Sequence, residues 1–405
     1  MKPTLGWTML SRDEMRQVER SLTNSEQDTR DEIGFLLIHQ GFADRFFPGT
    51  SVLHTRVRYV LLIPWLFRSA ASSRQRGSDL DATIRRQLIQ LAIRLKRIGQ
   101  EPYDVIGGDK LGQLTSQPPD RVYWTALRQW GLLLPTVVTR TEALRRLQAG
   151  ARAPALDDDG GPLDDDSYEV FAGLPEPPAD WGYPQSALHF KMPANERDFL
   201  RRKLSLLTRP GEDAQSLLAR LVAARHSYPD TPSGLPAGLD ARADATDKRA
   251  LGVARDAAVL AAIGRAVYGA LVEQLRADDG GVDNGTYRKQ LQSHFATYGD
   301  AAGRCDLDAL EVFLPELPLH VRNVLRETRT YVRENKPENF ASLRDCYQTA
   351  EVIRKTAHRA RLLNTERSVQ RRVEWDSERH NTTPLHYRWR IVRAMLKDLS
   401  DDDED

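Results

Sequence analysis

The chain has 405 residues, of which 40% are hydrophobic and 28% charged, so it has the balance of a globular protein and enough length for more than one core. Its formal net charge of +1 excludes a uniform polycation, and any attraction for an acidic partner must come from local clustering of charge. Cys305 and Cys346 are the only cysteines, which excludes a disulfide framework or a multi-cysteine zinc site.

Residues 1–148 are predicted to form an N-terminal helical domain. In its fourth helix Ile84, Leu88, Leu91 and Leu95 recur at helical spacing and therefore share one apolar face. The predicted helices of this domain cover residues 13–22, 29–46, 52–71, 80–98, 119–131 and 141–147.

A turn at Pro48 and Gly49 is the most distinctive local pattern in this domain. Proline fixes φ and glycine permits a positive φ, so the chain can reverse here. Thr50 or Ser51 would then cap a helix that begins near Val52. The start of a helix offers unpaired N–H groups and a positive dipole, which suit an anion.

Basic residues on both sides of the turn strengthen the prediction of an anion-binding site. The candidate residues are Arg45, Ser51, Arg56 and Arg58. In the alternative interpretation the arginines are structural, and they neutralise Asp44, Glu32 or helix C-termini inside a polar core.

Residues 149–187 are predicted to be an acidic linker or loop insertion. Aspartate triplets at 157–159 and 164–166 alternate with glycine and proline, and large apolar side chains are scarce. Such a composition cannot build a core, and nothing in it fixes the geometry of a cation site.

Residues 188–399 are predicted to form a second helical domain, followed by an acidic tail at 400–405. A helix over 251–275 is apolar on nearly every side and carries three glycines, so we expect it to be the central core helix. The other predicted helices cover 195–207, 213–224, 284–298, 306–313, 319–335 and 339–363. The fold class is therefore mainly α, a bundle-like architecture of two helical blocks separated by the acidic insertion.

The C-terminal region is rich in basic residues with interleaved aromatic side chains. The pattern is typical of a surface that contacts a phosphate backbone or an unstacked base. The candidate nucleic-acid-binding residues are Arg354, Lys355, Arg359, Arg361, Arg388, Arg390, Arg393 and Lys397. In the alternative interpretation these side chains cover helical surface and pair with carboxylates elsewhere in the chain.

Catalytic patterns are weak. His189, Lys191 and Glu196 approximate the H-x-K-x4-D pattern of phospholipase D-type nucleases, but glutamate replaces aspartate and no second copy occurs. No metalloprotease, serine hydrolase or P-loop pattern is present. We therefore assign no catalytic residue and expect no cofactor and no metal.

We expect the chain to be cytoplasmic and to have no membrane partner. The longest apolar run, residues 59–67, is too short to cross a bilayer, which takes about 20 residues. Residues 1–7 lack the apolar core of a signal peptide, and the two cysteines fit a reducing cytosol.

Several short motifs together resemble an uncharacterised bacterial family of unknown function. They are Leu5-Gly6-Trp7, Asp31 to Gly34, Phe46 to Ser51, Thr55-Arg56 with Arg58-Tyr59, Pro64-Trp65, Tyr123-Trp124, Trp130-Gly131 and Tyr387-Arg388-Trp389. Members of that family occur in gene clusters for antiphage defence, beside helicases and phospholipase D-like nucleases. The family has no established catalytic residues.

The resemblance implies an accessory role in antiphage defence. We expect a non-enzymatic subunit that contacts nucleic acid, or a partner helicase or nuclease, through its basic helical surface. The alternatives are a purely protein-binding scaffold subunit and, more weakly supported, a nuclease with an unrecognised active site.

Overall fold

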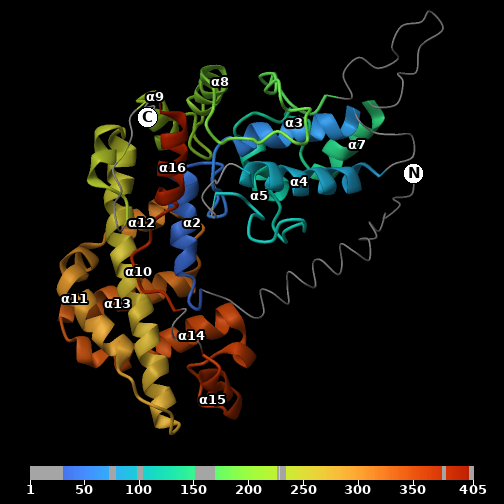
Figure 1. The fold of residues 1–405 in the computed structure, drawn as a ribbon. Helices are drawn as coiled ribbons and strands as arrows, with labels where there is room; N and C mark the ends of the chain where they lie inside the picture. Colours follow the sequence, from blue (N-terminus) through green and yellow to red (C-terminus); the bar gives the residue numbers. More distant parts are fainter. Residues whose placement is uncertain are drawn as a thin grey trace, which may run out of the picture. The chain divides into compact units, whose positions relative to one another are not determined.

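The computed structural model describes residues 31–72, 79–97, 104–150, 169–225, 228, 234–375 and 380–400 (Figure 1). Regular structure within these residues is helical and they form no β-strand, which confirms the predicted mainly α, multi-helix class. Isolated bridges join Leu133 to Phe171 and Thr208 to Gln215. Across the same residues no helix is both long enough and apolar enough to cross a membrane.

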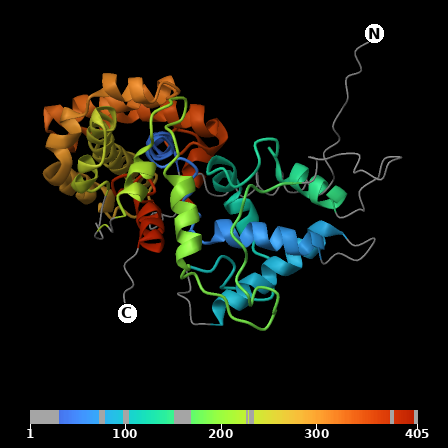
Figure 2. The same ribbon diagram turned by 90° about the horizontal axis from the view of Figure 1, so that it is seen from above.

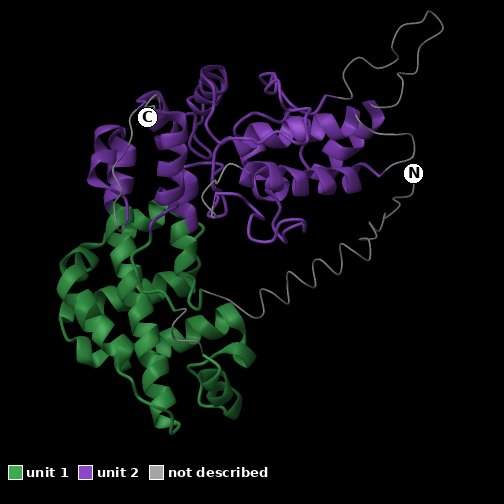
Figure 3. Cartoon of the chain, viewed as in Figure 1, with its two compact units in different colours: residues 1–39, 253–385 green, residues 40–252, 386–405 purple. Residues whose placement is uncertain are grey.

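The helices divide into two compact units, each assembled from separate stretches of sequence (Figure 3). Unit 1 combines the chain up to His39 with Val253–Leu385, and unit 2 combines Gln40–Gly252 with the chain from His386 onward. The helices α2 (Phe35–Phe46) and α10 (Ala245–Asp278) contribute residues to both. The sequence places domains in chain order, at 1–148 and 188–399, and that division stays a prediction.

Unit 2 is organised around α3 (Tyr59–Ser72), whose residues 59–67 are all buried. It packs beside α4 (Leu80–Lys96), as the two views in Figures 1 and 2 show. The predicted face of Ile84, Leu88, Leu91 and Leu95 is buried, which confirms the periodicity. The other helices are α5 (Pro119–Val122), α6 (Trp124–Gln129), α7 (Arg140–Gly150), α8 (Ala194–Leu204), α9 (Leu217–Ala223), the 3-10 helix η1 (Ala237–Ala241) and α16 (Trp389–Leu399).

The turn after α2 forms as predicted, but the helix expected to begin near Val52 does not. Gly49 has a φ of +79°, and Trp130 Nε1 donates a hydrogen bond of 3.0 Å to the Pro48 carbonyl. Residues 51–58 contain turns but no helix, because side chains capture their backbone N–H groups: Thr55 N bonds to Tyr123 Oη. The prediction of a helix start at this turn is therefore wrong.

Part of the predicted acidic insertion packs against α3 and α4 within unit 2. The aspartate triplets lie within 151–168, outside the described residues. Residues 169–187 are described, and Arg94 of α4 donates hydrogen bonds to the carbonyls of Asp180, Trp181 and Ser186. Trp65 Nε1 donates to the Pro175 carbonyl at 2.9 Å. These contacts hold the end of the insertion on α3 and α4.

Unit 1 contains the 34-residue helix α10 from Val253 onward, which packs against α11. Gly264 and Gly269 allow close packing, because a Cβ at Gly264 would lie 2.5 Å from Phe35 Cζ and one at Gly269 would lie 2.6 Å from Tyr287 Cδ1. The other helices are α11 (Thr286–Arg304), α12 (Leu307–Phe313), α13 (Leu319–Glu334), α14 (Arg344–Lys355), α15 (Glu366–Val373) and the 3-10 helices η2 (Pro337–Leu343) and η3 (Ala357–Arg359).

The single helix predicted over 339–363 is instead three elements. The first is the 3-10 helix η2, and α14 follows it but ends at Lys355. Thr356 has φ +70° and ψ 156°, which no helical residue adopts, so the chain turns sharply there before η3. The break separates Arg359 and Arg361 from the helix that carries Arg354 and Lys355.

Candidate functional site

The eight predicted basic contact residues belong to different units. Four lie in unit 1: Arg354, Lys355, Arg359 and Arg361. Four lie in unit 2: Arg388, Arg390, Arg393 and Lys397. Each group therefore has to be judged within its own unit.

In unit 2, Arg388 is buried and has an internal role. Its Nη1 donates to Asp44 Oδ1 at 2.6 Å and to the Thr50 carbonyl at 2.8 Å, so it links α16 to the turn after α2. Its prediction as an exposed contact is therefore wrong. Arg390 and Lys397 are exposed and Arg393 is half-buried, on the face of α16 opposite its buried apolar stripe.

The candidate anion site at the turn is occupied by the protein's own carboxylates. Arg45 pairs with Glu212 at 2.9 Å and with Asp247 at 3.5 Å. Ser51 Oγ accepts a hydrogen bond from the Leu53 N–H in an exposed turn and not at a helix start. The predicted anion pocket is not assembled here.

Arg56 is the centre of a second internal network in unit 2. It pairs with Asp398 of α16 at 2.5 Å and with Asp104 at 2.8 Å. Asp398 also accepts the Val57 N–H at 3.0 Å, and burial is the main reason that the pKa of its carboxyl is raised. The structural interpretation fits Arg56, although with Asp104 and Asp398 as partners in place of Asp44 or Glu32.

Arg58 forms an almost fully enclosed ion pair in unit 2. Both oxygens of Glu196 accept from its guanidinium at 2.7 Å, and Nη1 also donates to the carbonyls of His189 and Lys191. Glu196 is 1% exposed and fully engaged, so it cannot serve as the acid of the H-x-K-x4-E pattern. His189 and Lys191 lie exposed on the loop that Arg58 holds.

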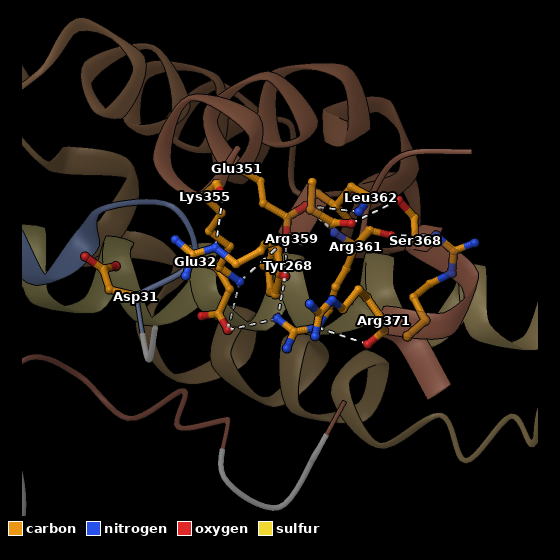
Figure 4. Close-up of polar contacts among 12 residues, drawn as sticks. Asp31, Glu32, Tyr268, Glu351, Lys355, Arg359, Arg361, Leu362, Ser368 and Arg371 are labelled. Carbon is orange, nitrogen blue, oxygen red and sulfur yellow. Dashed lines mark hydrogen bonds and ion pairs between the residues drawn. The ribbon is translucent and has the colours of Figure 1, made fainter. Parts of the chain in front are cut away.

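In unit 1 the predicted residues belong to a buried polar group that we call the Glu351 cluster, which comprises Glu32, Tyr268, Glu351, Lys355 and Arg361 (Figure 4). Glu351 is fully buried and accepts from Tyr268 Oη at 2.6 Å and from the backbone N–H groups of Arg361 and Leu362 at 2.9 Å. It therefore fixes the chain just after η3 onto α14.

Glu32 supplies the second carboxylate of the cluster. It lies 3.6 Å from Lys355 Nζ and 3.5 Å from Arg361 Nη1, and Figure 4 shows these side chains converging beside Tyr268. Burial lowers the pKa of Lys355, against the opposing effect of Glu32, and burial raises the pKa of Tyr268. Lys355 is 4% exposed, so its prediction as a surface contact is wrong.

His380 packs against the same cluster. Its Nδ1 lies 4.0 Å from Glu32 Oε2, and Nε2 pairs with the Arg265 carbonyl at 2.8 Å. Burial lowers the pKa of His380, so the imidazole is neutral at pH 7 and adds no cation to the cluster.

Arg359 differs from its neighbours because no carboxylate approaches it among the described residues. Its Nε donates to the Lys355 carbonyl at 3.2 Å, while Nη1 is buried without a hydrogen-bond partner. Arg354, by contrast, reaches Asp31 at 3.6 Å, and Arg371 and Arg372 pair with Glu374 and Asp279.

The backbone is strained at Thr356, between Lys355 and Arg359. Its φ of +70° is unusual for a β-branched residue and costs about 1–3 kcal/mol. Such strain persists where the surrounding contacts over-determine the backbone, and here the bonds from Glu351 to Arg361 and Leu362 do so.

Tyr268, Glu351 and His380 are absent from the sequence prediction of a site. The spacing of Glu351 and Lys355 is the i,i+4 signal of an ion pair, and it is visible in the sequence. Tyr268 comes from α10 and Glu32 precedes α2, so no local pattern connects them with α14. Within the described residues, no group of three or more His, Cys, Asp or Glu side chains is placed to hold a metal ion.

Comparison with known proteins gives one result. No curated protein and no solved structure matches the chain. The model of a family described as a family of unknown function, DUF6361, matches residues 3–403. Because that match spans nearly all of the 405 residues, the chain belongs to the DUF6361 family of unknown function.

Proposed function

We propose that this chain is a non-enzymatic accessory subunit that contacts nucleic acid through the end of α14, η3 and α15. We call residues 354–371 the α14–α15 basic segment. The setting, antiphage defence beside a helicase or nuclease, comes from the gene neighbourhoods of the family that the sequence resembles. Among the predicted basic residues, those of this segment support the proposal best.

The observation that carries the proposal is the environment of Arg359. Its guanidinium has one hydrogen bond and a buried Nη1 without a partner. An unsatisfied buried donor costs about 1–3 kcal/mol, and more for a charged group. A phosphate at the accessible part of this half-buried side chain would neutralise the charge, which no carboxylate of the described residues does.

The charge of the segment points to the same ligand class. Residues 354–371 contain six lysines and arginines and one acid, Glu366. Asp31, Glu32, Glu351 and Glu374 reach Arg354, Lys355, Arg361 and Arg371, but no carboxylate in the described residues pairs with Arg359 or with the exposed Arg367. The two arginines without carboxylates supply the excess charge that a polyanion requires.

The test is DNA binding measured by fluorescence anisotropy at salt concentrations from about 50 to about 300 mM. Over such a range the affinity of a protein that contacts several phosphates falls by roughly 10³-fold. We expect the Arg359→Gln/Arg367→Gln variant to lose at least about tenfold in affinity for labelled duplex or single-stranded DNA. For duplex DNA, the salt slope should decrease by about 0.9 for each phosphate that the variant no longer neutralises.

Two matched variants control for the removal of charge in general. Arg145→Gln removes an exposed arginine of α7 that pairs with Glu142, and Arg85→Gln removes an exposed arginine of α4 that pairs with Asp81. Both should bind DNA like the unaltered chain. An equal loss of affinity in the controls would show that the segment has no special role.

Other outcomes favour the alternatives. If the chain binds no DNA even at the lowest salt, the proposal fails and a purely protein-binding scaffold becomes the better interpretation. If the chain cleaves labelled DNA, it is a nuclease and the accessory role is refuted.

A further inference from the structure

Two carboxylates at the start of the described chain face the α14–α15 basic segment. Asp31 and Glu32 lie just before α2, and they belong to unit 1 together with the segment. Asp31 accepts the backbone N–H groups of Gly34 at 3.0 Å and of Leu36 at 3.2 Å, which fixes its carboxylate at the start of α2. We call these two residues the Asp31–Glu32 pair.

The pair reaches three of the six basic residues of the segment. Asp31 lies 3.6 Å from Arg354, and Glu32 lies 3.6 Å from Lys355 and 3.5 Å from Arg361. Figure 4 shows the Glu32 side chain pointing toward Lys355 and Arg361. Glu32 and Arg361 are 329 residues apart in the sequence, so only folding brings these charges together.

These three contacts are longer than the tight ion pair between Arg372 and Asp279 in the same unit, which is 2.6 Å. All three also exceed the roughly 2.7–3.2 Å of an N–H···O hydrogen bond. They therefore depend mainly on charge attraction, for which another anion can compete. The side chain of Arg354 is 36% exposed and that of Arg361 is 20% exposed, so a phosphate can approach both from solvent.

We propose that the Asp31–Glu32 pair competes with nucleic acid for Arg354 and Arg361, and so limits the affinity of the α14–α15 basic segment. The inference rests on the proposed function, because it concerns the regulation of the same segment. A phosphate near these arginines meets a carboxylate already in place, so it neutralises less charge and the two anions repel each other. Neutralising the pair makes both arginines available as phosphate contacts.

The test is the same salt series of DNA binding, with the full chain carrying Glu32→Gln. This variant should bind duplex DNA about tenfold more tightly at the lowest salt, because a repelling charge beside Arg361 is gone. Its salt slope should become steeper by about 0.9 for each phosphate newly contacted. A role of Glu32 in folding alone would leave that slope unchanged.

Glu311→Gln is the matched control. Like Glu32, Glu311 pairs with two cations of unit 1, which are Arg322 and Arg326 of α13. The variant therefore removes the same charge from the same unit, but from arginines outside the basic segment. It should bind DNA like the unaltered chain.

Asp31→Asn tests the other carboxylate and keeps the start of α2 capped, because the amide oxygen still accepts the Gly34 N–H. This variant should also bind DNA more tightly than the unaltered chain. Adding Arg354→Gln should abolish the gain, since Arg354 is the cation that Asp31 approaches. A gain that persists without Arg354 would overturn the inference.

The remaining outcomes separate this inference from the proposed function. If the unaltered chain binds DNA but Glu32→Gln and Asp31→Asn bind no more tightly, or if Glu311→Gln gains as much, the inference is overturned while the proposed function stands. If none of these chains binds DNA at the lowest salt, the proposed function fails and the inference fails with it.

Discussion

The Arg58–Glu196 pair offers the sharpest test of how this protein uses its arginines. Both side chains are almost fully buried, and their charged groups meet through two hydrogen bonds of 2.7 Å. Arg58→Met keeps the apolar stem but leaves the Glu196 carboxylate buried without its partner. It also removes the donor to the carbonyls of His189 and Lys191.

The expected loss in the free energy of unfolding is large. Breaking a buried ion pair on one side costs about 3–5 kcal/mol, because an uncompensated charge remains inside. Replacing both residues, as Arg58→Met with Glu196→Met, removes the stranded charge, so the double variant should be more stable than either single variant. Arg145→Met, which breaks an exposed pair on α7, should cause no measurable loss.

Urea unfolding followed by tryptophan fluorescence measures these stability differences in unit 2, which contains Arg58 and Glu196. Of the seven tryptophans, Trp65, Trp124, Trp130, Trp181 and Trp389 belong to unit 2. If Arg58→Met loses less than about 1 kcal/mol, or if the single losses simply add in the double variant, the pair is not the buried anchor described above.

Three further predictions concern single residues in particular surroundings. Gly269→Ala should lose about 1–3 kcal/mol of stability, measured by thermal unfolding, because the added Cβ meets the Tyr287 ring. The Cβ of Gly252→Ala meets nothing within 4 Å, so this variant should gain up to about 1 kcal/mol from helix propensity. Similar shifts for both variants would contradict the packing at Gly269. Thr356→Gly should stabilise unit 1 by about 1 kcal/mol, measured by urea unfolding, because glycine accepts a φ of +70°; a loss would show that the residue is unstrained. Burial lowers the pKa of His54 to about 4, below its value in the unfolded chain. The stability that the neutral imidazole contributes is therefore present above about pH 6.5 and is lost as the pH falls toward 4, by up to about 1.4 kcal/mol per pH unit. His54→Asn should flatten the pH profile of the unfolding free energy over that range, and an unchanged slope would refute the assignment.

The sequence predicts helices well where periodic apolar faces decide the structure. The face of α4 and the buried α10 follow directly from residue spacing, because helix packing requires a continuous apolar stripe. It predicts the ends of helices less well. The start expected at Val52 and the continuation expected past Lys355 both fail where distant groups, such as Tyr123 and Glu351, capture backbone N–H groups.

The sequence does not indicate which arginines are internal. Arg56 and Arg58 are close together on a turn, and their partners Asp398 and Glu196 lie 342 and 138 residues away. A charge run shows how many cations are present, but the carboxylates that neutralise them come from elements brought close only by folding. For the same reason, the sequence cannot show that a compact unit is assembled from separate stretches.

Pairing therefore shows better than the number of basic residues which arginines are left without a carboxylate inside the fold. Each arginine held by a carboxylate has its charge compensated within the fold, and a phosphate would have to displace that carboxylate to bind it. Arg359 and Arg367 require no such displacement, since no carboxylate in the described residues reaches them. A polyanion would therefore displace no carboxylate of the described residues to bind Arg359 and Arg367. Glu366 is the one acid of the α14–α15 basic segment, so Glu366→Gln should strengthen DNA binding while leaving the unfolding free energy nearly unchanged. Weaker or unaltered binding in that variant, measured in the same salt series, would mean that DNA does not sense the charge of this segment.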